Sequence, residues 1–166
     1  SWAEVHDNAS LDITDAITLE AWVYFDGSIN QAGLLDKYHY STNTRSYDLR
    51  KNTSGNIQFT ISSNGTDNLF LNYTGSQIST GWHHILATYD KVNQKLYVDG
   101  VLNNSTAQTA SIYNSDKPVT IGILDPSVSS NIFDNQIAQP RIYNRALSAE
   151  EVQRNYDAGK NIYTND

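Results

Sequence analysis

Residues 81–100 constrain the fold of this chain more than any other stretch. They read G-W-H-H-I-L-A-T-Y-D, then a polar K-V-N-Q-K, then L-Y-V-D-G. β-Branched and aromatic residues fill 82–89, which predicts a long strand, and residues 95–98 predict a short one. Asp99-Gly100 favours a two-residue turn between strands, because both central positions of that turn need a positive φ. The stretch therefore predicts antiparallel β-sheet.

Short strands separated by turn residues recur along the whole chain, which is typical of an all-β sandwich. In residues 18–23 the alternation places Leu19, Ala21 and Val23 on one face, and Glu20 and Trp22 on the other. No linker or internal repeat interrupts the sequence, so residues 1–166 are predicted to form a single domain. The predicted strands are 2–5, 18–25, 33–39, 46–51, 56–62, 69–73, 82–89, 95–98, 101–102, 118–123 and 136–143.

One short helix is predicted near residues 148–157. Ser148 and Glu151 have the spacing of a capping box, in which each side chain satisfies a backbone N–H of the other residue. Leu147 and Val152 have the spacing of a hydrophobic staple. Gly159 is expected to end the helix, since glycine is favoured just beyond a helix C-terminus.

Three segments of the chain resemble laminin G-like domains of the concanavalin A-like jelly-roll superfamily. They are residues 81–100, residues 11–23 (L-D-I-T-D-A-I-T-L-E-A-W-V) and residues 140–152 (P-R-I-Y-N-R-A-L-S-A-E-E-V). The resemblance implies a two-sheet antiparallel jelly-roll sandwich with one short C-terminal helix. The superfamily includes lectins, adhesion modules, sugar-binding accessory domains and some glycosidases, so the fold does not name the function.

The resemblance also raises a question about one sheet edge. Relatives of this kind carry one more strand ahead of the segment that matches residues 2–6. Residues 162–164 (Ile-Tyr-Thr) have high β-propensity, so we expect the C-terminal segment to complete the open edge. It would do so within one molecule or in a neighbouring copy.

Composition narrows the class of function. Charged residues make up 17% of the chain, whereas Asn, Ser and Thr together supply 49 positions, a balance that is common outside the cell. The net charge of −7 argues against nucleic acid, which is bound through clustered Lys and Arg. The sequence has no apolar stretch near the ~20 residues of a membrane span, which argues against insertion. We therefore expect an extracellular or surface location.

The sequence predicts no enzyme and no catalytic residues. Glycosidases of the superfamily use alternating carboxylates on one strand, since their chemistry needs a paired acid and nucleophile. No such strand is present, and Glu150-Glu151 lies where acidic residues favour the helix dipole. His83 and His84 are adjacent on a strand, so they face opposite sides of the sheet and cannot share a metal ion.

Calcium binding is left open by the sequence, and no other cofactor is predicted. Many relatives place an Asp in the penultimate strand, within G-x-I-D-x-V-R-I-Y, and this chain has Ala138 at that position. The candidate carboxylate ligands are Asp7, Asp15 and Asp134, and Asp12 lies in the same early loop as the first two.

The densest group of candidate sugar-binding residues lies between residues 38 and 48. Sugar C–H faces stack on aromatic rings while hydroxyls form directional hydrogen bonds, and this segment supplies both kinds of partner. The alternative is that Tyr38 and Tyr47 pack between the sheets. The candidate ligand-binding residues are Tyr38, His39, Tyr40, Arg45, Tyr47 and Asp48.

Six Asn residues lie in N-x-[ST] glycosylation motifs. They are Asn8, Asn52, Asn64, Asn72, Asn103 and Asn104. Of these, Asn64, Asn103 and Asn104 fall in predicted turns, where a glycan would project freely.

Two functions fit these features. The first is an extracellular, non-catalytic binding or adhesion module that recognises glycans or a surface protein. The second is a structural subunit of a self-assembling filament, appendage or virion fibre, whose main partners are copies of itself.

Overall fold

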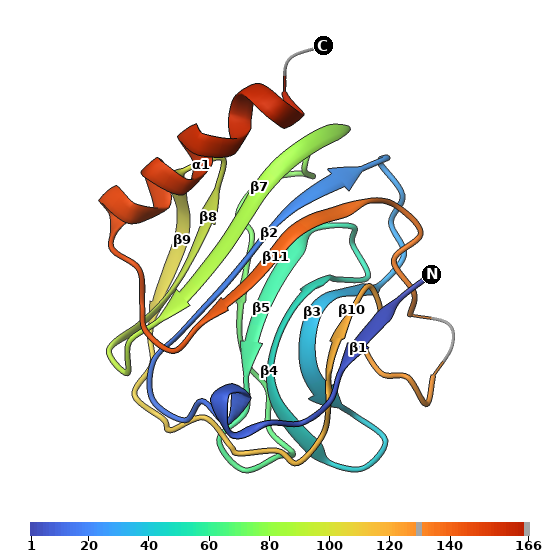
Figure 1. The fold of residues 1–166 in the computed structure, drawn as a ribbon, viewed down its shortest axis with the longest axis vertical. Coiled ribbons are helices and arrows are strands. Elements are labelled where there is room, and N and C mark those ends of the chain that lie inside the picture. Colours follow the sequence, from blue (N-terminus) through green and yellow to red (C-terminus); the bar gives the residue numbers. More distant parts are fainter. Residues whose placement is uncertain (129–130, 165–166) are drawn as a thin grey trace.

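The computed structural model describes residues 1–128 and 131–164, and in them the strands form two antiparallel sheets packed face to face (Figure 1). The six-stranded sheet has the order β1-β10-β3-β4-β5-β6, and the five-stranded sheet has the order β11-β2-β7-β8-β9. This arrangement confirms the predicted two-sheet sandwich. The elements are β1 (Ala3–Val5), η1 (Ala9–Leu11), β2 (Ile17–Phe25), β3 (Ala32–His39), β4 (Thr44–Lys51), β5 (Ile57–Ile61), β6 (Leu69–Asn72), β7 (Gly81–Tyr89), β8 (Asn93–Val98), β9 (Val101–Ala107), β10 (Val119–Ile121), β11 (Ile137–Tyr143) and α1 (Ala149–Tyr163).

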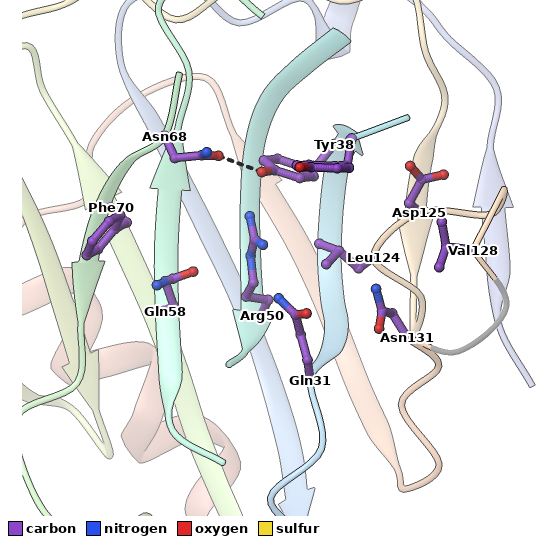
Figure 2. Close-up of a pocket in the computed structure, with 11 residues that line it drawn as sticks. Gln31, Tyr38, Arg50, Gln58, Asn68, Phe70, Leu124, Asp125, Val128 and Asn131 are labelled. Atoms are coloured by element: carbon purple, nitrogen blue, oxygen red, sulfur yellow. Dashed lines mark hydrogen bonds between the residues drawn. The ribbon is translucent and has the colours of Figure 1, made fainter. Parts of the chain in front are cut away.

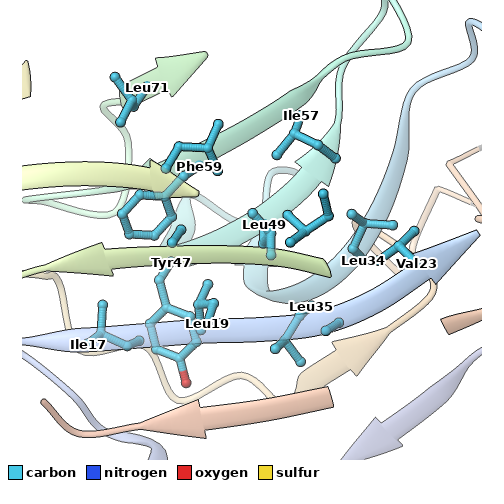
Figure 3. Close-up of a cluster of buried hydrophobic side chains, with 14 of the residues drawn as sticks. Ile17, Leu19, Val23, Leu34, Leu35, Tyr47, Leu49, Ile57, Phe59 and Leu71 are labelled. Atoms are coloured by element: carbon cyan, nitrogen blue, oxygen red, sulfur yellow. The ribbon is translucent and has the colours of Figure 1, made fainter. Parts of the chain in front are cut away.

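The hydrophobic core fills the space between the two sheets (Figure 3). The five-stranded sheet contributes Leu19, Ala21 and Val23 of β2, as the alternation predicts. The six-stranded sheet contributes a row of directly paired residues, Leu35, Leu49, Phe59 and Leu71, from four neighbouring strands. Because side chains alternate along a strand, the residues next to that row point out of the sandwich, away from the core.

The turn between β8 and β9 has the predicted geometry. Asp99 and Gly100 have φ values of 51° and 79°. The Asp99 carboxylate accepts the backbone N–H of His84 at 2.8 Å and lies 2.7 Å from Nδ1 of His83. The Trp-His-His and Asp-Gly ends of the opening motif therefore meet, and both histidines have structural partners.

Helix α1 begins as the sequence predicts. The hydroxyl of Ser148 accepts the backbone N–H of Glu151 at 3.3 Å, and the Glu151 carboxylate accepts the backbone N–H of Ser148 at 2.9 Å. Leu147 and Val152 are both buried in a second apolar cluster beneath the helix. The capping box and the staple thus determine where the helix starts and which face it buries.

The end of α1 differs from the prediction, since the helix continues to Tyr163 instead of stopping before Gly159. A Cβ atom at Gly159 would lie 2.4 Å from Nε1 of Trp22, so glycine serves close packing here and not termination. The expectation that residues 162–164 complete a sheet edge within one molecule is wrong, whereas completion of an edge in a neighbouring copy stays a prediction. Ile162 and Tyr163 are helical, and the Tyr163 ring stacks on Trp22 with 4.8 Å between centroids.

Glu20 anchors α1 to the outer face of the five-stranded sheet. Its buried carboxylate accepts hydrogen bonds from His84 at 3.0 Å, Arg141 at 2.8 Å, Tyr143 at 3.0 Å and Asn155 of the helix at 2.9 Å. Burial opposes the charge, but these partners hold the pKa of Glu20 below its usual value. Helix α1 is the only helix among the described residues that covers a sheet. It is therefore held by the fully hydrogen-bonded Glu20 carboxylate as well as by apolar packing.

Strand β9 is longer than predicted, running to Ala107 instead of residue 102. Residues 103–106 (Asn-Asn-Ser-Thr) have the composition of a turn, but their backbone pairs with β8 as far as Asn93. Pairing in an edge strand needs only backbone groups, so polar side chains do not prevent it.

The helices within the described residues lack the combination of length and apolarity that a membrane span needs.

A candidate ligand-binding groove on the six-stranded sheet

A groove lies on the outer face of the six-stranded sheet, on the side opposite the core. Side chains alternate along each strand, so the residues next to the core residues point outward, and they form the floor of the groove. Asp36, Asp48, Thr60 and Phe70 are directly paired across β3, β4, β5 and β6, and they face outward. The segment 122–128, which follows β10, packs against Gly33 of β3 and borders the groove.

The groove has a volume of about 540 Å³, within the roughly 300–1,000 Å³ of small-molecule sites. Figure 2 shows Phe70 and Gln58 on one side, Gln31, Leu124 and Asn131 on the other, and Arg50 between them. The rings of Phe70 and Tyr40 are 54% and 61% exposed, so both are available to a ligand. The lining residues are Gln31, Tyr38, Tyr40, Arg50, Gln58, Asn68, Phe70, Leu124, Asp125, Val128 and Asn131.

Tyr38 spans the groove floor. Its hydroxyl donates to Oδ1 of Asn68 at 2.5 Å, across the intervening strands (Figure 2). The guanidinium carbon of Arg50 lies 4.3 Å from the centroid of the Tyr38 ring. Burial raises the pKa of Tyr38, so the phenol keeps its proton and remains a donor.

Arg50 and Asp48 form a bidentate ion pair beneath the groove. Nε of Arg50 donates to Oδ1 of Asp48 at 2.6 Å, and Nη2 donates to Oδ2. Although burial opposes its charge, Asp48 raises the pKa of Arg50. This pairing uses one edge of the guanidinium, formed by Nε and Nη2, and holds Arg50 in one orientation.

Asp36 lies beside this pair without a partner of its own. It is 0% exposed, and neither carboxyl oxygen has a hydrogen-bond partner within the described residues. Burial, together with the charge of Asp48, raises the pKa of Asp36 well above its usual value. The raised pKa favours the protonated, uncharged form of Asp36, next to an Asp48–Arg50 pair whose opposite charges cancel.

The loop side of the groove carries a saturated carboxylate, Asp125. It accepts the backbone N–H of Ser41 at 3.1 Å and that of Ser127 at 2.9 Å, and both serine hydroxyls also donate to it. Despite burial, these donors lower the pKa of Asp125. His39 lies 4.0 Å away, and burial lowers its pKa, which favours the neutral ring.

The structure separates the candidate ligand-binding residues. Tyr38 and Tyr40 line the groove, and the Arg45 guanidinium lies behind Tyr40, 4.4 Å from the ring centroid. Asp48 is buried under the groove and His39 is mostly buried beside Asp125, so neither side chain is exposed to a ligand in the groove.

Tyr47 faces the core. Its ring is 0% exposed and its hydroxyl donates to the carbonyl of Leu11 at 3.1 Å, as the packing alternative expected.

Several groove residues were not found from the sequence. Gln31, Gln58, Asn68, Phe70 and Asn131 come from separate segments and meet only through sheet pairing. One signal could have identified Phe70: it lies between Leu69 and Leu71 in a predicted strand, so alternation turns its ring away from the core. The pair of carboxyls at Asp36 and Asp48 was missed for the same reason, since it spans two strands.

The candidate calcium ligands do not converge. Asp7 and Asp12 both bind the buried ammonium of Lys37, with Nζ to Oδ1 distances of 2.7 Å. Asp15 pairs with Lys91 at 3.2 Å, and Asp134 is exposed just before β11. Across residues 1–128 and 131–164, no three His, Cys, Asp or Glu side chains gather so that they could hold a metal ion. A lysine ammonium already neutralises the early-loop carboxylates.

The glycosylation motifs fall in different environments. Asn8 and Asn64 are exposed, and each accepts backbone N–H groups two residues on through its side-chain oxygen. Asn103 and Asn104 lie in β9 and not in a turn, so that prediction is wrong. Their amides donate to the carbonyls of residues 74 and 72. Asn52 and Asn72 are half-buried.

Solved structures that resemble this fold include binding domains of Paraclostridial Mosquitocidal Protein 1 and of botulinum neurotoxins. The binding domain of Paraclostridial Mosquitocidal Protein 1 has a TM-score of 0.75 and 17% identity, over 97% of this chain and 42% of that chain. The binding domain of Botulinum Neurotoxin DC in complex with SialylT has a TM-score of 0.72 and 14% identity, over 95% of this chain and 39% of that one. The same domain in complex with rat synaptotagmin II has a TM-score of 0.71 and 13% identity, over 95% and 40%.

The chain thus spans about two fifths of the length of these structures, and at such identities the likeness concerns the fold. Among curated proteins, none matches the sequence significantly. A laminin G family model, described as the concanavalin A-like lectin/glucanases superfamily, matches residues 1–153. The family model covers most of the chain, and the structure has two antiparallel sheets in which the Trp-His-His and Asp-Gly ends of the motif meet. The chain therefore belongs to the concanavalin A-like lectin/glucanase superfamily.

Proposed function

We propose that this domain is a non-catalytic glycan-binding module and that the groove on the six-stranded sheet is its binding site. The observation that carries the proposal is the pairing of two exposed rings, Tyr40 and Phe70, with amide side chains in one groove. Rings accept the C–H faces of sugars, and amides both donate to and accept from hydroxyls. The amides are Gln31, Gln58, Asn68 and Asn131.

The toxin binding domains lend the proposal general support, because that of Botulinum Neurotoxin DC is in complex with SialylT and cell entry of botulinum neurotoxin type C depends on interaction with two ganglioside molecules. The Botulinum Neurotoxin DC domain is also seen in complex with the protein synaptotagmin II, so a protein partner is the competing outcome. We favour a glycan for this chain because the exposed groove surface combines isolated rings with amides. Protein interfaces instead centre on a continuous apolar core.

A non-catalytic role is supported by the burial of the two carboxyls beneath the groove. Asp36 and Asp48 are both 0% exposed, and both oxygens of Asp48 are bound by Arg50. Hydrolysis of a glycosidic bond needs two carboxyls that flank the bond itself. We therefore expect binding without turnover, and release of a cleaved product that depends on either carboxyl would contradict this.

We also infer that the module works outside the cell, on the basis of its charge-poor, Asn-, Ser- and Thr-rich composition. Self-assembly into a filament stays a prediction. Gel filtration at micromolar concentration distinguishes a monomer from an assembly.

A glycan array followed by calorimetry on the strongest hit tests the binding proposal. Phe70→Ala and Tyr40→Ala should each weaken the affinity about fivefold, since a stacked ring contributes roughly 1 kcal/mol. Val101→Ala is the matched control, because Val101 is 66% exposed on the other sheet. Failure to bind any glycan, or equal affinity in all three variants, would refute the proposed site.

A further inference from the structure

The charged groups around the groove are already used by the protein. Asp48 occupies Nε and Nη2 of Arg50, which is the only cationic side chain that lines the groove among the described residues. Arg45 lies outside the lining, where it is 6% exposed, stacks on Tyr40 and donates to the carbonyl of Thr66. In the described part of the chain, therefore, no free cation points at a ligand in the groove.

The remaining charge in the lining is negative. Asp125 is ionised and held by serine donors, and no Lys or Arg is paired with it. Arg50, Asp48 and Asp125 together sum to one negative charge, and ionisation of Asp36 would only add to it. The whole chain carries a formal net charge of −7, so its long-range field has the same sign.

We propose that the groove selects uncharged glycans over acidic ones, and that Asp48 sets this selectivity by neutralising Arg50. The inference rests on the proposed glycan-binding function and names its ligand class. The carboxylate or sulfate of an acidic sugar loses hydration when it enters a groove, and an unpaired cation is the strongest compensation for that loss. The selectivity then comes from the lack of an unpaired cation, because this lack makes binding of an acidic glycan less favourable than binding of a neutral one.

The wild-type protein is tested on an array of matched oligosaccharide pairs that differ only by one terminal sialic acid or one sulfate. We expect the neutral member of each bound pair to bind more tightly, with an affinity that changes little between low and high NaCl. Tighter binding of the acidic members would overturn this inference and leave the glycan-binding function standing. Binding to no glycan would refute the proposed function itself.

Asp48→Asn tests the role of the ion pair. It releases Arg50, so the ratio of acidic to neutral affinity should rise at least about tenfold, as expected for one charge-assisted hydrogen bond. Asp157→Asn is the matched control, since it makes the same change in net charge on an exposed position of α1. The ratio should stay at the wild-type value in that control.

Gln58→Lys keeps the inference testable if Asp48→Asn does not fold. Gln58 is half-buried in the groove wall, donates to Asn72 and lies directly opposite Arg50 in the sheet, so a lysine there adds a second cation beside the Arg50–Asp48 pair. It should shift the ratio toward acidic glycans as well. Asp48→Asn and Gln58→Lys are compared with the wild type wherever they fold. If the ratio of acidic to neutral affinity is unchanged in them, charge in the groove does not determine selectivity.

Discussion

Replacing Asp36 with asparagine isolates the free energy of keeping an unpartnered carboxyl in the interior. Asp36 is 0% exposed, has no hydrogen-bond partner within the described residues, and lies directly opposite Asp48 in the sheet. Burial and the neighbouring carboxylate raise its pKa well above that of an unfolded Asp, which is about 3.9. Asparagine has nearly the same shape but does not ionise.

The sign and the magnitude follow from proton linkage. Above about pH 4 the unfolded chain releases the Asp36 proton while the folded chain retains it. The free energy of unfolding of the wild type therefore falls by about 1.4 kcal/mol per pH unit from this group. The fall continues until the pH reaches the folded-state pKa of Asp36. In Asp36→Asn that contribution is absent, so the variant gains stability relative to the wild type as the pH rises.

Urea unfolding followed by tryptophan fluorescence, at unit intervals from about pH 4 to about pH 7, measures this difference. Asp67→Asn is a control in which the change in the free energy of unfolding should have the opposite sign. Although burial opposes it, hydrogen bonds from Ser62 and Ser63 lower the pKa of Asp67. That control should be less stable than the wild type by a nearly constant amount above about pH 5. A pH-independent difference between Asp36→Asn and the wild type would refute the reasoning.

Three further substitutions test how the elements are held. Gly159→Ala should destabilise the fold by roughly 1–3 kcal/mol, because the added Cβ would lie 2.4 Å from Nε1 of Trp22; a melting temperature equal to the wild type would contradict the packing argument. Ser148→Ala removes the N-cap of α1 and should cost about 1 kcal/mol in urea unfolding, with no change in glycan affinity. Lys37→Met leaves two carboxylates without the ammonium that lies 2.7 Å from each and should cost roughly 3 kcal/mol; a neutral effect would show that water replaces the lysine fully.

Local chemistry was readable from the sequence because each signal acts over a few residues. The Asp99-Gly100 turn follows from the need for positive φ, and the start of α1 follows from the spacing of Ser148 and Glu151. Alternation along β2 identified the core face correctly. The end of α1 was mispredicted, because the partner that requires a glycine at position 159 lies more than a hundred residues away.

The groove was decided by tertiary structure. Tyr38 and Tyr40 were accessible to sequence reasoning because they lie close together with polar neighbours, but Tyr47 in the same cluster faces the core. The face that a residue presents depends on the register of its strand, and the bulge between residues 37 and 38 changes that register within the segment.

The sequence alone therefore determined the fold class, the Asp99-Gly100 turn, the start of α1 and the core face of β2, because these depend on local conformational preference and on periodicity. Which rings and amides share a surface was decided only when strands β3, β4, β5 and β6 paired. The same pairing placed Asp36 opposite Asp48 and left no cation free in the groove. Pairing partners are set by packing of the whole sandwich, since burial of the core residues selects one register among many.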